Sequence, residues 1–215
     1  MDNEILILCL GVVSPTFWLA KLLKAKFDKN KVIRKLNWLY FLSSIVCAIW
    51  MYFVVEPSNS IMIFVMYIVL PVILLSRCSE ILYAFLIDAY DKISAQDQSS
   101  NSTPLPAKEW WHFEIGSEPI EMHHRMVFAL RSYIELIINF SVLYFLLPCE
   151  QWKELKEPLT VVDTLYFSGV TITTLGYGDI TPTGWFPKFL SVYEVFCGFT
   201  LLVVCFAVYL SKKSN

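Results

Sequence analysis

The residues that could do chemistry in this chain are concentrated between positions 169 and 198. Five of the seven glycines lie in that interval, and Gly176 and Gly178 are separated by a single residue. Successive backbone carbonyls can point to one side only if the backbone alternates in hand, and glycine accepts a positive φ at little cost. Such a row of oxygens can replace the water shell of a cation when four chains bring their rows together. Residues 174–178, Thr-Leu-Gly-Tyr-Gly, are therefore a candidate cation-binding loop.

The composition places this loop in a membrane protein. The chain has 215 residues, of which 56% are hydrophobic and 17% are charged, and its mean hydropathy is +0.55. A soluble domain carries about 25% charged residues. The formal net charge of −2 provides no basic field for nucleic acid. The acids, histidines and six cysteines form no catalytic pair or metal-ligand spacing, so we expect neither an enzyme nor a bound cofactor.

Five apolar runs are long enough to cross a bilayer of about 30 Å. We expect an all-α membrane protein with spans at about 5–23, 36–55, 57–76, 120–148 and 189–211. The first run lacks a basic leader and a cleavage site, which indicates a retained helix rather than a signal peptide. Helical spacing continues beyond residue 76, with Arg77 and Glu80 at i and i+3. Pro15 and Pro71 lie within spans, where a kink is tolerated.

These runs divide the chain into two modules. Residues 1–93 form an expected three-helix N-terminal module with a cytoplasmic extension. Residues 94–117, rich in Ser, Gln, Asn and Pro, read as a cytoplasmic linker. Residues 118–215 contain the glycine-rich loop between the last two spans. The chain ends four residues after Ser211, so we expect no large cytoplasmic ring.

The basic residues predict the orientation of the spans. Residues 21–35 hold seven Lys or Arg and one acid, which places that loop in the cytoplasm. With five spans, the N-terminus is then outside and the C-terminus is cytoplasmic. The glycine-rich loop faces the outside. Residues 159–173 before it read as a short re-entrant helix, because Pro158 suits a first turn and Asp163 favours the positive end of the helix dipole.

Residues 132–211 resemble the two-helix pore module of bacterial potassium channels. The resemblance rests on Thr-Leu-Gly-Tyr-Gly-Asp at 174–179, which follows a short helix and precedes a span. The family's loop is Thr-Val-Gly-Tyr-Gly, and Leu175 replaces a valine that acts through its carbonyl. The resemblance implies a homotetramer in a prokaryotic cell membrane, with K⁺ as the permeant ion. It assigns the ion-binding filter to Thr174, Leu175, Gly176, Tyr177 and Gly178, with K⁺ held at the first four.

The resemblance also implies roles for neighbouring residues. Thr173 and Asp179 flank the filter, and Tyr166 falls where the family has an aromatic donor to the aspartate. Gly198 falls at the gating hinge of the inner helix, with a close-packing glycine as the alternative. Val170 stands where some members carry a glutamate, which puts that form of inactivation in doubt. The same register places three apolar residues at the inner cavity, Phe199, Leu202 and Phe206.

Several ionisable residues leave alternatives open. Glu194 lies within the last span and either bonds to the pore helix behind the filter or faces the pore. We expect Glu135 at the membrane interface. His123 and His124 are either exposed bystanders or groups whose charge acts on the inner gate. Acids on the outer side either concentrate cations or form a solvated turret, namely Glu150, Glu154, Glu157, Asp163 and Asp179.

The expected function is passive, potassium-selective conduction. No helix carries Arg or Lys at every third position, so we expect no voltage sensor. A weakly selective cation channel and a non-conducting regulatory subunit remain alternatives, whereas one intact filter argues against a fused uptake transporter. The first three helices resemble no family we can name, and the sequence leaves them open as a ligand or lipid sensor, a protein-docking surface or a packing collar.

Overall fold

The computed structural model describes residues 29–53, 59–98, 122–154 and 157–213, and the regular secondary structure in these ranges is helical. The described residues include no strand, only an isolated bridge between Trp152 and Pro182. The expected all-α architecture is therefore confirmed. The predicted span at 5–23 and most of the predicted linker lie outside the described residues.

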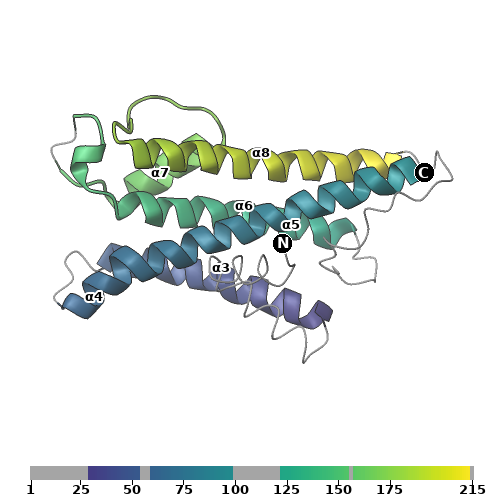
Figure 1. Cartoon of the computed structure of the whole chain (residues 1–215), viewed down its shortest axis with the longest axis horizontal. Coiled ribbons are helices and arrows are strands. Elements are labelled where there is room, and N and C mark those ends of the chain that lie inside the picture. Colours follow the sequence, from purple (N-terminus) through teal and green to yellow (C-terminus); the bar gives the residue numbers. More distant parts are fainter. Residues whose placement is uncertain (1–28, 54–58, 99–121, 155–156, 214–215) are drawn as a thin grey trace, which may run out of the picture.

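Figure 1 shows the helices in the colours of their chain order. In chain order they are α3 (Lys29–Phe53), α4 (Ser60–Phe64), a π-helical turn η1 (Val65–Val69), α5 (Leu70–Gln98), α6 (Met122–Phe145), a 3-10 turn η2 (Cys149–Gln151), α7 (Val161–Ile172) and α8 (Trp185–Lys213). The α4, η1 and α5 segments run on without a break from Ser60 to Gln98. This continuous helix includes the extension that the residues after position 76 predicted.

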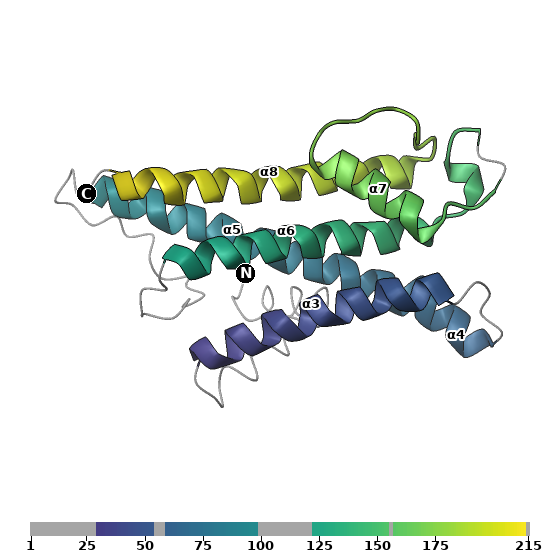
Figure 2. The ribbon, with the colours of Figure 1, turned by 180° about the vertical axis from the view of Figure 1, so that it is seen from behind.

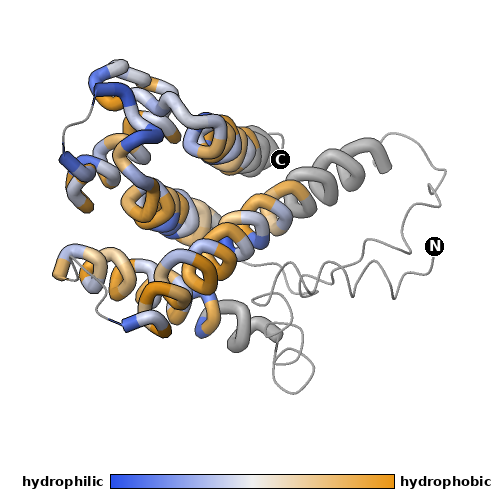
Figure 3. The backbone as a smooth tube through the Cα atoms, turned by 60° about the vertical axis from the view of Figure 1, so that its left-hand side comes forward, coloured by the Kyte–Doolittle hydropathy of each residue, from blue (hydrophilic) through white to orange (hydrophobic). Residues whose placement is uncertain are grey.

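Four of the described helical segments are long and apolar enough to cross a membrane, and hydrophobic residues dominate them in Figure 3. They are Lys35–Phe53, Ser60–Leu86, Met126–Phe145 and Trp185–Val203. The helix α3 begins at Lys29, inside the basic segment that we expected to be a loop, since a helix can continue past the membrane surface. The helix α8 begins at Trp185, four residues before the expected start. Its Pro187 is tolerated in the first turn because the N–H groups there have no intrahelical partner.

Helix α6 is the element on which the others pack. It contacts α3, α5, α7 and α8, while α5 also packs along α8 and α7 packs on α8. In Figures 1 and 2, α3 and α8 lie on opposite sides of α6, and α5 crosses α6 obliquely. The N-terminal helices α3 and α5 are therefore in direct contact with the segment that carries the glycine-rich loop.

The π-helical turn η1 has an identifiable cause. Pro71 lacks a backbone N–H and cannot donate to the carbonyl four residues earlier. The chain widens directly before it, and the Leu70 N–H bonds to the carbonyl of Val65, five residues back. The helix then returns to α-helical geometry. A single π turn thus absorbs the proline without ending the span.

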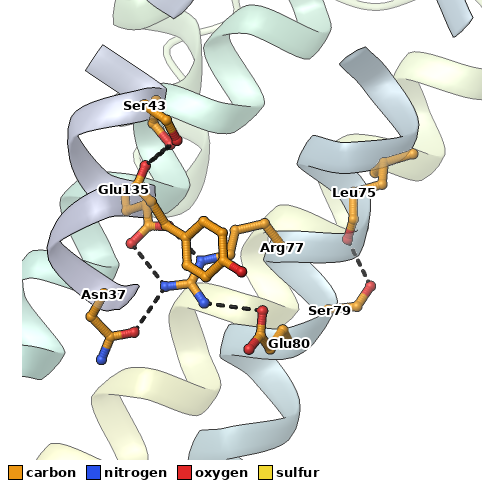
Figure 4. A network of polar contacts seen from close by, with 9 residues as sticks. Asn37, Ser43, Leu75, Arg77, Ser79, Glu80 and Glu135 are labelled. Carbon is orange, nitrogen blue, oxygen red and sulfur yellow. Dashed lines mark hydrogen bonds and ion pairs between the residues drawn. The ribbon is translucent and has the colours of Figure 1, made fainter. Parts of the chain in front are cut away.

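The buried guanidinium of Arg77 joins three helices (Figure 4). Its Nε and Nη2 donate to the two carboxylate oxygens of Glu135 on α6, at 2.7 and 3.3 Å. Its Nη1 donates to Glu80 on α5 at 3.1 Å, which confirms the expected i, i+3 pair. Nη2 also donates to Asn37 on α3 at 3.1 Å, and the guanidinium carbon lies 4.4 Å from the ring centre of Tyr40.

The expected interfacial position of Glu135 is wrong. Its side chain is only 1% exposed and is bound by Arg77, which itself is 6% exposed. Spacing along one helix gave no sign that a second helix supplies a guanidinium at that level. A charge in an apolar interior is costly alone and becomes tolerable when a partner of opposite charge satisfies it. Arg77 and Glu135 therefore require each other.

We expect Glu135→Ala to destabilise the protein by about 3–5 kcal/mol, because it removes the buried carboxylate that pairs with Arg77 and leaves the guanidinium buried. The double variant Arg77→Met/Glu135→Leu should recover most of that loss, since it removes both charges. Thermal unfolding of the purified protein in detergent micelles measures both effects.

Glu80→Gln is the matched control, because the Glu80 side chain is 20% exposed and Glu135 still pairs with Arg77. Its effect should be about 1 kcal/mol or less. Equal destabilisation by the single Glu135 variant and by the double variant would contradict the mutual dependence.

Candidate functional site

The short helix α7 lies between α6 and α8 and carries the glycine-rich loop at its C-terminal end. Thr160 caps its N-terminus in a reciprocal box with Asp163. The Asp163 N–H donates to Thr160 Oγ1 at 3.2 Å, and the Thr160 N–H donates to Asp163 Oδ2 at 2.9 Å. Helix α7 therefore starts at Val161, two residues later than the predicted 159. The Thr-x-x-Asp pattern at residues 160–163 marks this start in the sequence. Asp163 thus serves as part of the N-terminal cap of α7.

The C-terminal end of α7 turns sharply into the loop. The Thr174 N–H donates to the Thr171 carbonyl at 2.9 Å, and the Leu175 N–H donates to the Val170 carbonyl at 3.0 Å. This pair of bonds is the Schellman motif, which needs a left-handed residue after the helix cap. Thr174 fills that position with a φ of 61°, and Thr173 is the cap residue. The motif fixes where the helix ends and the loop begins.

Backbone conformation in residues 174–178 matches the glycine spacing. Gly176 has a φ of 53° and Gly178 a φ of 80°, as predicted for alternating hand. Among the residues that the structure describes, no backbone N–H donates to a carbonyl of 174–178. All five residues are exposed in the single chain, with Leu175 at 59% and Tyr177 at 67%. The loop thus offers a set of unpaired carbonyl oxygens at the molecular surface.

Tyr166 on α7 supports the loop from one side. Its ring stacks on Tyr177 with 6.5 Å between the ring centres and an angle of 8° between the planes. The interaction of its hydroxyl with the nearby carboxylate of Asp179 raises the pKa of Tyr166 and lowers the pKa of Asp179 from their ordinary values. The geometry thus brings together the two residues that the sequence analysis paired.

Glu194 forms the main polar centre behind the loop. It is fully buried on α8. Its Oε1 accepts from the Ser168 hydroxyl on α7, and its Oε2 accepts from the Tyr144 hydroxyl on α6 at 2.8 Å. Ser168 also lies 2.9 Å from the carbonyl of Ile137 on α6. One carboxylate therefore joins α6, α7 and α8, and it is buried away from the exposed face of α8.

Gly198 lies one turn beyond Glu194 and packs against the last residue of α7. A Cβ built on Gly198 would lie 2.6 Å from Cγ1 of Ile172 and 3.2 Å from its carbonyl oxygen. The absence of a side chain is what allows α8 to approach α7 this closely. The close-packing alternative for Gly198 thus has a direct geometric basis, while the helix α8 continues through it without a break.

The exposed face of α8 carries two of the predicted cavity residues. Phe199 is 62% exposed and Leu202 is 50% exposed. Phe206 belongs to α8, but its side chain is outside the described part. His123 and His124 likewise lie in the first turn of α6 with side chains outside that part. Both side chains are thus largely uncovered by the described part of the chain.

Four hydroxyl residues that hold α7 in place escaped the sequence analysis. Ser141 and Thr164 bond across α6 and α7 at 3.1 Å, and Tyr144 and Ser168 bind Glu194. Tyr144 further packs edge-on against Phe167, with 4.9 Å between ring centres. Their only signal was the occurrence of polar side chains inside apolar helices, where a hydroxyl needs a partner.

Comparison with known proteins places the same segment in an ion-channel context. Residues 132–212 match a protein family described as "Ion channel". A stretch of 62 residues, 29% of this chain, is 40% identical to 14% of two-pore potassium channel 2 of Arabidopsis thaliana. A stretch of 82 residues, 38% of the chain, is 33% identical to 19% of two-pore potassium channel 3 of the same plant. The chain is also 27% identical over 81 residues, 34% of its length, to 60% of protein LctB of Bacillus caldotenax.

These matches concern one part of each protein. The chain spans less than a fifth of the length of the two plant channels. No solved structure matches it. The similarity therefore supports an ion-channel segment in the C-terminal part of the chain.

We expect Gly198→Ala to destabilise the protein by about 1–3 kcal/mol, because the new methyl group overpacks the contact with Ile172. Thermal unfolding in detergent micelles measures the loss. Gly169→Ala is the matched control, since a Cβ there meets nothing within 4 Å. In the background of Ile172→Ala, which removes the nearest clashing atom, Gly198→Ala should cost clearly less. An equal cost in both backgrounds would show that the contact is not the cause.

Tyr166→Phe should raise the pKa of Asp179 toward its ordinary value, because the hydroxyl that stabilises the carboxylate is lost. The contact is present above the ordinary aspartate pKa of about 3.9 and is lost as the pH falls through the lowered pKa of the folded protein. The titration of ¹³C-labelled carboxyl groups by NMR, with Asp179→Asn to identify the signal, checks this. An unchanged midpoint in Tyr166→Phe would contradict the contact.

Proposed function

We propose that the chain is the subunit of a potassium-selective channel in which four copies surround one pore. Residues 174–178 form the selectivity filter, and K⁺ passes through it passively along its gradient. The observation that carries this proposal is the row of unpaired carbonyls between Thr174 and Gly178, with a positive φ at both glycines. The match of residues 132–212 to an ion-channel family and the identity to plant potassium channels support it.

The filter needs carbonyls from more than one chain. A K⁺ ion that leaves water must regain a shell of oxygen ligands, and one strand can reach it from one side only. Four strands around a common axis complete the shell. The exposure of Leu175, Gly176 and Tyr177 in a single chain agrees with a loop that neighbouring copies cover. The exposed Phe199 and Leu202 then line the cavity below the filter.

Helix α7 acts as the pore helix in this proposal. It enters the membrane between α6 and α8, is re-entrant, and directs the negative end of its dipole toward the cavity. Tyr166, Asp179 and Glu194 support the filter through the contacts described above. Because the N-terminal half of the chain contributes the basic residues of positions 21–35, we place α7 and the filter at the outer face of the cell membrane.

Voltage is not the proposed stimulus. A gating charge must be free to move through the membrane field. Arg77 is the basic residue deepest in its span, and it is bound to Glu135, Glu80 and Asn37. A guanidinium with that many fixed partners serves as an anchor between helices.

The purified chain in liposomes should give K⁺ flux that barium blocks and that Na⁺ does not replace. Gly178→Ala should lower this flux about tenfold or more, because each of four alanines must hold a positive φ at a cost of about 1–2 kcal/mol. Gly176→Ala should behave in the same way. Flux assays with a K⁺ gradient, compared at equal protein content, measure the loss.

Gly169→Ala is the control, because it adds the same methyl group on α7 without a contact or a positive φ. It should keep wild-type flux. Unchanged flux in Gly178→Ala would overturn the assignment of the filter. Equal permeation of Na⁺ and K⁺ would favour a weakly selective pore, and a well-formed tetramer without flux would favour a regulatory subunit.

A further inference from the structure

Helix α5 touches α8 through a hydroxyl pair. Ser79 Oγ lies 2.8 Å from the Leu75 carbonyl and 2.8 Å from the hydroxyl oxygen of Tyr193 (Figure 4 shows the first bond). A serine hydroxyl has one proton, and the carbonyl can only accept. Ser79 therefore donates to Leu75 and accepts the proton of Tyr193. The proton of this hydrogen bond is therefore donated by Tyr193 on α8 to Ser79 on α5.

The Tyr193 side chain is held in place from two other sides. Its ring lies 5.9 Å from that of Phe140 on α6 in an edge-on arrangement. It stacks on Phe189 of its own helix at 6.4 Å with an angle of 6° between the planes. The hydroxyl can therefore reach Ser79 without searching many rotamers, which lowers the entropic cost of the bond.

The Ser79 side chain is exposed, and its place is set by the backbone of α5. It lies two residues after Arg77, whose guanidinium binds Glu135 on α6 and Asn37 on α3. The position of Ser79 is thus set by the packing of α5 on the two neighbouring helices. A displacement of α5 at Ser79 therefore reaches α8 at Tyr193.

The next residue on α8 is the carboxylate that binds the pore helix. Glu194 contacts Ser168, and Gly198 contacts Ile172. Both pairs step by four residues, so the two helices run in the same direction here and meet on successive turns. The second contact lies two residues before Thr174. A shift of α8 at Tyr193 is therefore passed to α7 at the point where the filter begins.

We infer that Ser79 and Tyr193 are positioning residues through which the N-terminal helices set the geometry of the filter. The inference rests on the proposed function of residues 174–178. In this arrangement α5 acts on the outer half of α8, at the level of the filter, and holds Glu194 in register with Ser168. Helices α3 and α5 then act on the conduction site and are more than a packing collar.

The test compares Ser79→Ala, Tyr193→Phe and their double variant in liposomes with K⁺ and Na⁺ on opposite sides. Each single variant should lower the K⁺ over Na⁺ permeability ratio by about threefold to tenfold, the factor expected for one uncharged hydrogen bond. The double variant should lower it no further, because both changes remove the same bond. Ser79→Thr keeps a hydroxyl group at this position, so its permeability ratio should remain close to that of the wild type.

Ser43→Ala is the matched control, because the bond of this exposed serine on α3 to a described residue stays within its own helix, to the Tyr40 carbonyl at 2.7 Å. It should leave the ratio unchanged. Additive effects of the two single variants, or an unchanged ratio in both, would overturn the inference.

A second readout separates the inference from the proposed function. Hydrogen exchange of the α7 backbone amides, residues 161–172, should be faster in Ser79→Ala and Tyr193→Phe than in the wild type and in Ser43→Ala. If the wild-type chain conducts without selectivity, the filter proposal fails, and faster exchange in α7 would still support the coupling. Unchanged exchange in α7 would overturn the coupling whatever the flux shows.

Discussion

The need to satisfy one buried guanidinium organises the N-terminal half of the described chain. Arg77 lies in a helix long enough to cross a membrane, where a charge without partners is strongly unfavourable. It is satisfied only where α3 supplies Asn37, α5 supplies Glu80 and α6 supplies Glu135. Because these three helices must converge at that level, α5 is directed across α6 and reaches α8. The contact between the two halves of the chain follows from this convergence.

A second polar centre organises the other half. Within the described part of the chain, the carboxylate of Glu194 is satisfied by hydroxyls from Ser168 and Tyr144, and not by a cation. Lipid offers no hydrogen-bond partners, so polar side chains within spans are directed at one another. The two centres have different chemistry: the first joins helices with an ion pair, the second with hydroxyl groups. They are connected along α5 and α8 by Ser79 and Tyr193.

The sequence predicted features that depend on residues close together in the chain. It missed contacts between residues that are far apart in the chain. The left-handed glycines, the helix before them and the apolar spans depend on neighbours along the chain, and each has a local pattern. The Schellman end of α7 was also local, but a threonine at the left-handed position hides it because that position usually holds glycine. The partner of Glu135 is 58 residues away and that of Tyr193 is 114 residues away. No spacing rule within one helix identifies which face meets another helix, so Glu135 was misplaced at the interface.

The two exposed features of the single chain carry different weight for the proposed assembly. The apolar residues on the free face of α8, such as Phe199 and Leu202, are equally well satisfied by lipid and by protein, so their exposure alone does not require a partner. The carbonyls of residues 174–178 are different, because hydrocarbon cannot replace the hydrogen bonds they lack. Water, cations or both must meet them, and a wet row of carbonyls is stable inside a membrane only if protein encloses it. In the proposed assembly, the need for neighbouring copies therefore comes from the backbone of the loop, and the apolar face of α8 follows it.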